Sequence, residues 1–216
     1  MPKPRRVSNI LALAVLSTVY FRPMHPYEMA ATMRAHGKDQ DMKIKWGSLY
    51  TVVQNLEKHG LLEIVDSVRR SGRPERTVYR ITDAGRAELA DWTRELIEVP
   101  EREFPRFEAG LSVMAVLSPD EIAVLLRRRL DALEAQLAEQ RAVLAASAAV
   151  PRIFLIEAEY DLAVRDAEAA WVRGLLAEFT EGTLPGLAQW RDFHATGVMP
   201  AELVDLTEGS GLTERA

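Results

Sequence analysis

The stretch Gly47–Gly60 (GSLYTVVQNLEKHG) decides the fold of this chain. Its apolar residues Leu49, Val52, Val53 and Leu56 recur at helical spacing, which predicts a helix with one side in a core. The polar residues lie mostly on the other side. Gly60 predicts the end of the helix, because glycine is the residue that most readily follows a last helical turn.

A β-hairpin with a basic tip is predicted directly after this helix. The stretches 61–65 and 77–81 read as strands, and the turn between them carries four arginines within eight residues. Only Asp66 and Glu75 are close in sequence as carboxylate partners. The simpler alternative is a turn that only aids solubility. The order of a helix, a hairpin and a basic hairpin tip favours a winged helix-turn-helix instead. In that fold the helix enters a DNA major groove and the tip lies on phosphates.

Two helices are expected before this pair of elements. The first, over 9–19, is apolar nearly all round, which indicates burial on more than one side and suggests contact with a second subunit. The second, over 27–36, follows Pro26, whose missing N–H does no harm in a first turn. The segment 38–45 is a polar, basic loop, and Trp46 precedes the third helix.

The polar side of the third helix and the neighbouring basic residues are the candidate DNA contacts. Asn and Gln can bond an adenine edge twice, while Ser, Thr and Lys can reach bases or phosphates. An ordinary solvated helix face is the alternative for the same residues. The candidates are Lys43, Lys45, Ser48, Tyr50, Thr51, Gln54, Asn55, Lys58, Arg69, Arg70, Arg73 and Arg76.

Charge is distributed unevenly along the chain. Residues 1–90 hold 15 Lys/Arg and 9 Asp/Glu, a net charge of +6, within a chain whose total is −5. A polyanion would therefore be attracted to the first part and repelled by the rest. The absence of cysteine excludes disulfides and thiolate metal sites. The basic start and apolar stretch over 10–20 outline a signal peptide, but no small-residue cleavage site follows, so we expect a cytoplasmic protein without a membrane span.

The second half predicts helices that pair. A proline-bounded linker over 100–105 is followed by a short helix over 106–116 and a long one that Ser118 caps. Pro151 separates these from a last long helix over 152–179. The apolar stripe of the helix that Ser118 caps suits antiparallel or parallel packing against another helix. The large apolar area of the last helix needs a partner, and a second subunit is the economical one. The candidate dimer-interface residues are Leu13, Leu126, Leu133, Leu137, Tyr160, Ala167, Trp171 and Leu175.

Four aromatic residues could line a pocket for a flat apolar effector. They are Phe154, Tyr160, Trp171 and Trp190. The alternative is that these rings only pack in the core and the interface. An effector could change DNA binding only if it bound two arrangements of the helices with different affinity.

Several motifs of the chain resemble those of a known family. Gly47-Ser48-Leu49-Tyr50, the run 56–62, and the run 72–86 with Thr82-Asp83-Ala84-Gly85 are similar to PadR transcriptional regulators, as is 25–29 (HPYEM). The stretch 157–171 is similar to the helical domain of the virulence-activator subgroup. Val52-Val53 and Trp46 depart from the family pattern without changing the fold. The resemblance implies a homodimeric winged-helix regulator, repressor or activator, of a palindromic promoter site.

The sequence thus predicts a mainly α protein with a small β-hairpin: a winged helix-turn-helix over 1–99, a linker over 100–105, a helical dimerisation and effector domain over 106–206, and a flexible tail over 207–216. The expected partners are double-stranded DNA, a second copy and a small effector, and the expected action is that of a repressor. A helical protein-interaction module without DNA binding is the alternative. We expect no cofactor, metal or catalytic residue, because the four histidines are scattered and no glycine-rich phosphate loop occurs.

Overall fold

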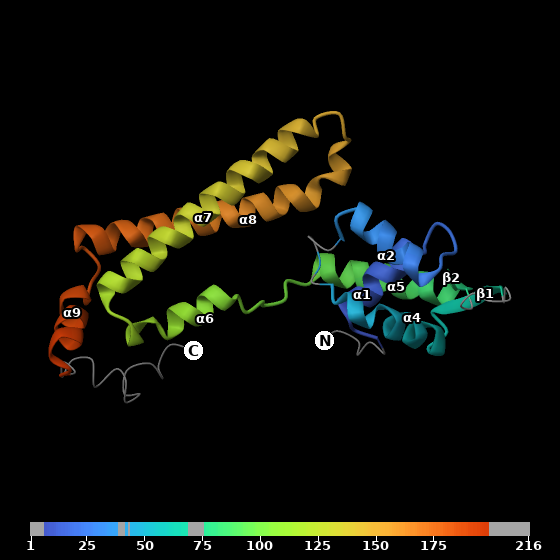
Figure 1. The fold of residues 1–216 in the computed structure, drawn as a ribbon, viewed down its shortest axis with the longest axis horizontal. Helices are drawn as coiled ribbons and strands as arrows, with labels where there is room; N and C mark the ends of the chain where they lie inside the picture. The colour runs from blue at the N-terminus through green and yellow to red at the C-terminus, as the bar shows by residue number, and fades with distance from the viewer. Residues whose placement is uncertain (1–6, 39–41, 43, 69–75, 199–216) are drawn as a thin grey trace. The chain divides into compact units, whose positions relative to one another are not determined.

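The computed structural model of the chain describes residues 7–38, 42, 44–68 and 76–198. The chain divides into two compact units, Met1–Arg102 and Glu103–Ala216 (Figure 1). Each unit has an apolar core of its own.

In the first unit, helices surround one core, and a hairpin precedes the last of these helices in sequence. The elements are α1 (Ile10–Thr18), α2 (Pro26–Ala35), the 3-10 turn η1 (Trp46–Ser48), α4 (Leu49–Lys58), β1 (Leu62–Val68), β2 (Arg76–Ile81) and α5 (Asp83–Glu98). Helix α1 contacts α2, α4 and α5, and Figure 1 shows the hairpin of β1 and β2 beside these helices. The predicted winged helix-turn-helix is confirmed.

Helix α1 is the centre of this core. Asn9 caps it, because its side-chain oxygen accepts the Leu11 N–H at 2.9 Å. Every residue from Leu11 to Leu16 is buried inside the unit. Leu13, expected at a subunit interface, is only 8% exposed. The suggestion that α1 faces a second subunit is thus corrected: α2, α4 and α5 cover the apolar surface that prompted it.

The end of α4 and the start of α5 meet at one place. Gly60 takes the left-handed conformation, with φ at 71°, and the next N–H, of Leu61, returns to the Leu56 carbonyl at 2.9 Å. Thr82 caps α5 by accepting the Gly85 N–H at 3.0 Å, and its hydroxyl donates to the Gly60 carbonyl at 2.7 Å. One threonine side chain therefore fixes the first turn of α5 to the end of α4.

The hairpin packs one face on this core. Leu62 pairs with Ile81, Ile64 pairs with Tyr79, and the register shifts at a bulge between Ile64 and Asp66. Leu62, Tyr79 and Ile81 are buried. Strand β1 runs to Val68, three residues beyond the predicted strand, because pairing with β2 continues after the bulge.

The second unit is helical. Its elements are α6 (Arg106–Ser112), the 3-10 turn η2 (Met114–Val116), α7 (Pro119–Ala146), the 3-10 turn η3 (Arg152–Phe154), α8 (Ile156–Glu181) and α9 (Leu187–Thr196). Ser118 caps α7 as predicted, accepting the Glu121 N–H at 3.3 Å. Helix α9 was not predicted, and the expected single helix over 106–116 is instead α6 followed by η2.

Helices α7 and α8 run antiparallel and pack against each other, and they cross in the view of Figure 1. Leu126, Leu133 and Leu137 are buried in the core of this unit, together with Val172 and Leu176 of α8. The prediction that these three leucines form the dimer interface is corrected, since the partner that covers them is α8 of the same chain.

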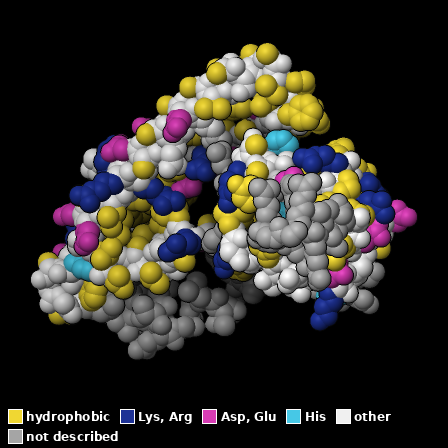
Figure 2. Space-filling view, turned by 45° about the vertical axis from the view of Figure 1, so that its right-hand side comes forward, with side chains coloured by type: hydrophobic (Ala, Val, Ile, Leu, Met, Phe, Trp, Pro, Cys, Tyr) yellow, Lys and Arg dark blue, Asp and Glu magenta, His cyan; other side chains and the backbone are white. Residues whose placement is uncertain are grey.

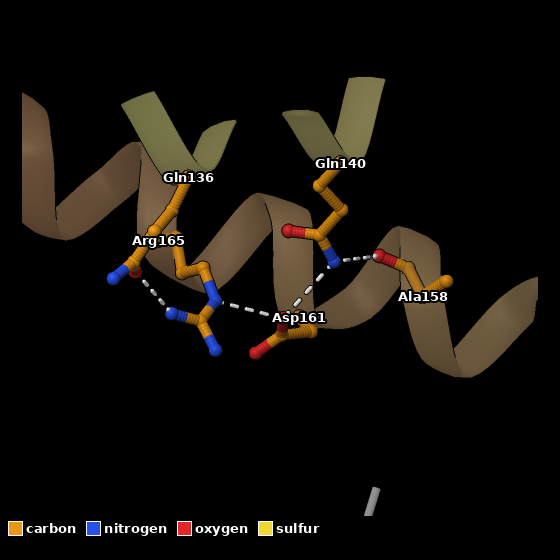
Figure 3. Close-up of polar contacts among 5 residues, drawn as sticks. All are labelled: Gln136, Gln140, Ala158, Asp161 and Arg165. Atoms are coloured by element: carbon orange, nitrogen blue, oxygen red, sulfur yellow. Dashed lines mark hydrogen bonds and ion pairs between the residues drawn. The ribbon is translucent and has the colours of Figure 1, made fainter. Parts of the chain in front are cut away.

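Polar residues cross this helix pair where its leucine stripe is interrupted (Figure 3). The Gln140 amide donates to Asp161 at 3.0 Å and to the Ala158 carbonyl at 3.2 Å. Arg165 donates to the same Asp161 at 2.7 Å and to Gln136 at 2.8 Å. The hydrogen bond from Arg165 holds the pKa of Asp161 below its ordinary value; partial burial opposes this, and the Gln140 bond adds to it.

Candidate nucleic-acid interface

Helix α4 presents one polar face to solvent. Its apolar residues are buried against the rest of the first unit, as predicted. The exposed residues of the helix include five of the predicted DNA contacts. These are Tyr50, Thr51, Gln54, Asn55 and Lys58. The buried face fixes the helix, so the exposed face is a preformed surface of hydrogen-bonding side chains.

The turn into α4 uses polar groups for its own structure. The Ser48 hydroxyl donates to the Lys45 carbonyl at 2.8 Å, and Ser48 is only half-exposed. Ser48 therefore shapes the entry to the helix, while the Lys45 side chain is exposed. The Arg34 guanidinium of α2 lies 4.1 Å from the ring centre of Trp46, which ties α2 to this turn.

The start of α2 lies next to the start of α4. His25 caps α2 with its ring: Nδ1 accepts the Tyr27 N–H at 3.1 Å, while the His25 N–H donates to Glu28 at 3.2 Å. The ring of His25 also meets Tyr50 edge to face, at 6.5 Å between centroids. Tyr27 is 72% exposed beside them and was not among the predicted contacts. Its place directly after Pro26, in a first helical turn, was the signal available in the sequence.

The hairpin is described only up to its basic tip. Glu63 of β1 and Arg80 of β2 form an exposed ion pair at 2.6 Å. The predicted contacts Lys43, Arg69, Arg70 and Arg73 lie outside the described residues, and for Arg76 only the backbone, in β2, is described. Burial raises the pKa of Tyr79 at the base of the hairpin, and the negative charge of Glu57 adds to this effect.

The remaining predicted interface residues lie on α8. Tyr160 and Trp171 are 71% and 51% exposed, Ala167 is exposed, and Leu175 is half-buried. These residues are seven, four and four positions apart, so they share one side of the helix. The opposite side, with Val172 and Leu176, packs on α7. Helix α8 thus has a second apolar side that its own unit leaves open.

The four predicted effector residues do not line one pocket, which corrects that prediction. Phe154 is in η3 and Trp171 lies seventeen positions later; at about 1.5 Å per residue they are roughly 25 Å apart. Trp171 meets Phe107 edge to face at 6.0 Å, whereas Trp190 of α9 packs on Phe179 at 5.8 Å. Trp171 lines a cavity of about 420 Å³ together with Phe107.

Other kinds of site find no support in the described residues. Among them, no group of three or more His, Asp or Glu side chains is placed to hold a metal ion. None of the helices in the described ranges is both long enough and apolar enough to cross a membrane.

Three comparisons place these features among known proteins. The model of the transcriptional regulator PadR-like family matches residues 15–91. No match was found among the curated proteins. Bacillus subtilis PadR in complex with operator DNA is similar in fold, with a TM-score of 0.64 and 20% identity over 79% of this chain and 99% of that one. The same protein in complex with p-coumaric acid gives 0.66 and 19%, over 80% and 99%.

The Vibrio cholerae virulence activator AphA has a TM-score of 0.60 and 22% identity, over 79% of this chain and 98% of that one. At these identities the solved structures show a shared fold, and the family model matches from within α1 to within α5. Residues 15–91 of the chain thus resemble the transcriptional regulator PadR-like family, in the part that holds the winged helix-turn-helix.

Proposed function

We propose that this protein is a sequence-specific DNA-binding transcriptional regulator that acts as a repressor. The observation that carries the proposal is the exposed polar face of α4, held on a buried apolar face in a winged helix of a regulator family. Bacillus subtilis PadR, which is similar in fold, is described in complex with operator DNA.

The residue types on α4 suit both kinds of DNA contact. The neighbouring amides of Gln54 and Asn55 can bond the adenine edge in the major groove. Lys45 and Lys58, exposed before and at the end of the helix, can neutralise phosphates. Base contacts from the middle and charge at the two ends are what a reading helix needs.

We infer that the regulator acts as a homodimer on a palindromic site. The open apolar side of α8, which carries Tyr160, Ala167 and Trp171, supports this inference, because exposed apolar surface of this kind marks an interface. A two-fold symmetric protein places two reading helices on two equivalent half-sites, which makes the site a palindrome.

Release from DNA by a small effector completes the proposal. Trp171, one of the four residues expected to bind an aromatic effector, lines a cavity. An aromatic effector would therefore meet this ring and Phe107 rather than all four residues.

A protein-interaction module without DNA binding is the competing function. The net charge of +6 on residues 1–90 favours DNA, because a protein-binding winged helix has no need of it. The two functions differ in salt dependence, since release of counterions from phosphates makes DNA affinity fall steeply with salt.

Fluorescence anisotropy on the protein's own upstream region tests the proposal. We expect affinity to fall at least tenfold between about 50 and 200 mM salt. Gln54→Ala and Asn55→Ala should each reduce the preference for operator over random DNA about tenfold, the effect of one lost base contact. Arg73→Ala should weaken binding to both DNAs equally.

Gln189→Ala, an exposed substitution on α9, is the matched control and should change nothing. Affinity that is the same at low and moderate salt would overturn DNA binding. Equal losses on operator and random DNA for the two α4 variants would remove α4 as the reading helix.

A further inference from the structure

The second unit contains an aliphatic cavity with one cation in its lining. The cavity, of about 390 Å³, lies between α6, η2 and the first turns of α7. Small-molecule pockets have volumes of roughly 300–1,000 Å³. The lining includes Leu111, Met114, Leu117, Ile122, Leu125 and Leu126. Figure 2 shows hydrophobic side chains gathered around a hollow on the left-hand side of the view.

Side chains of helix α9 contact two backbone carbonyls of the segment that forms one wall of the cavity. The Trp190 indole N–H donates to the Leu117 carbonyl at 3.2 Å, and His194 Nε2 lies 3.0 Å from the Ala115 carbonyl. Neither Trp190 nor His194 lines the cavity. Because these two carbonyls already have partners among residues that do not line the cavity, the wall formed by η2 offers a ligand mainly apolar side chains. Such a wall suits an apolar ligand and offers little to a polar one.

Arg129 is the one charged residue in the lining. Its guanidinium lies 3.7 Å from the ring centre of Phe107, and its Nε and Nη2 atoms both donate to Glu168 of α8. Within the described residues, Nη1 has no hydrogen-bond acceptor. The ring and Glu168 therefore hold the guanidinium still, with one edge left for a further anion.

We propose that this cavity binds an aliphatic monocarboxylate of the medium-chain fatty acid class. The chain would lie among the leucines, and the carboxylate would take the free edge of Arg129. Branched aliphatic walls favour a flexible chain over a flat ring, since Phe107 is the one aromatic residue in the lining. Glu168 borders an adjoining cavity of about 420 Å³, so the carboxylate would approach on the side away from it. The binding step does not depend on the proposed DNA binding.

Calorimetric titration of the full chain without DNA tests the proposal, with octanoate and octanol as probes. We expect octanoate to bind at least tenfold more tightly than octanol, because a charge-assisted hydrogen bond is worth that factor. Arg129→Gln should remove this advantage and leave octanol affinity unchanged. Arg128→Gln, an exposed neighbour outside the lining, is the charge control and should behave as wild type.

A second pair of variants tests the place of binding. Leu125→Trp narrows the cavity at a half-open position and should abolish binding of octanoate and octanol, whereas Val124→Trp, next to it but outside the lining, should keep both. Circular dichroism confirms that each variant folds. Three results would overturn the proposal: no octanoate binding by wild type, equal affinity for octanoate and octanol, or unchanged octanoate binding by Leu125→Trp. Each leaves the anisotropy test of DNA binding intact.

Discussion

Gly85 fixes the closest approach between α5 and the start of the hairpin. A Cβ atom built at this position would lie 2.1 Å from the Leu61 carbonyl oxygen and 2.8 Å from an Ile81 side-chain carbon. The oxygen belongs to the backbone, which cannot turn away as a flexible side chain would. The first turn of α5 can therefore reach the hairpin only if residue 85 has no side chain.

Gly85→Ala should destabilise the first unit. The added methyl group forces α5 away from Leu61, and overpacking of this kind costs about 1–3 kcal/mol. The urea concentration at the midpoint of unfolding should be lower for the variant than for wild type, and the change should appear in the unfolding transition of the first unit. Gly110→Ala on α6 is the control, because a Cβ there meets nothing within 4 Å and alanine favours a helix. A Gly85→Ala protein as stable as wild type would show that α5 can shift without loss.

Residue patterns predicted which side of α4 is buried and which is exposed, but not the contacts that α4 makes with neighbouring elements. Helical spacing was enough to assign Leu49, Val52, Val53 and Leu56 to the core, since burial on one side is what amphipathic spacing reports. It could not show that the Ser48 hydroxyl donates to the Lys45 carbonyl, or that the His25 ring meets Tyr50 edge to face. Those facts depend on where separate elements meet, which spacing within one element does not record.

At the scale of elements, the α7–α8 pair combines an apolar seam with polar crossings. Arg129 pairs with Glu168, Arg173 with Glu134, and Arg141 with Asp166, each across the two helices. The stripe of α7 breaks at Gln140 because that side chain bonds to α8. The sequence predicted an apolar stripe and a partner helix, but it could not decide between α8 and a second chain, because both would cover the same leucines.

Asp161 makes part of this pairing dependent on pH. Its pKa is depressed in the folded protein, so its stabilising contribution is complete above the unfolded pKa of about 3.9 and is lost as pH falls through the folded value. Asp161→Asn should lower the free energy of unfolding at pH 7 by less than about 1 kcal/mol, because the pair is partly exposed and screened by solvent.

Urea titrations of wild type and Asp161→Asn from pH 7 to pH 2 measure this effect. The difference between the two proteins should be constant above about pH 5 and shrink below about pH 4. Asp131→Asn, on the exposed side of α7, controls for the loss of one negative charge. A difference that grew on acidification would mean that Asp161 destabilises the folded state.

For the whole molecule, the two units differ in the surface that they expose. The first unit has an apolar core and offers the polar face of α4 to solvent. The second unit leaves apolar side chains in the open along α8 and where the α7–α8 hairpin turns, at Val150, Ile153 and Phe154 (Figure 2). One copy could read one half-site, so the proposed palindrome needs a second copy. We propose that the second copy binds at the open side of α8.

Ala167→Glu should therefore separate the proposed dimer and weaken operator binding together. Ala167 is exposed between Tyr160 and Trp171, so glutamate costs the single chain little but buries a charge in any interface formed there. Light scattering should report a dimer for wild type and a monomer for the variant. Operator affinity should fall at least tenfold, since a monomer holds one half-site without the second contact. Ala177→Glu is the control: Ala177 is exposed on α8 but points about a quarter turn around the helix axis from Ala167, so this variant should change neither the dimer nor operator affinity. If Ala167→Glu stayed dimeric, the interface would lie elsewhere; if it became monomeric but kept full operator affinity, reading would not need two copies.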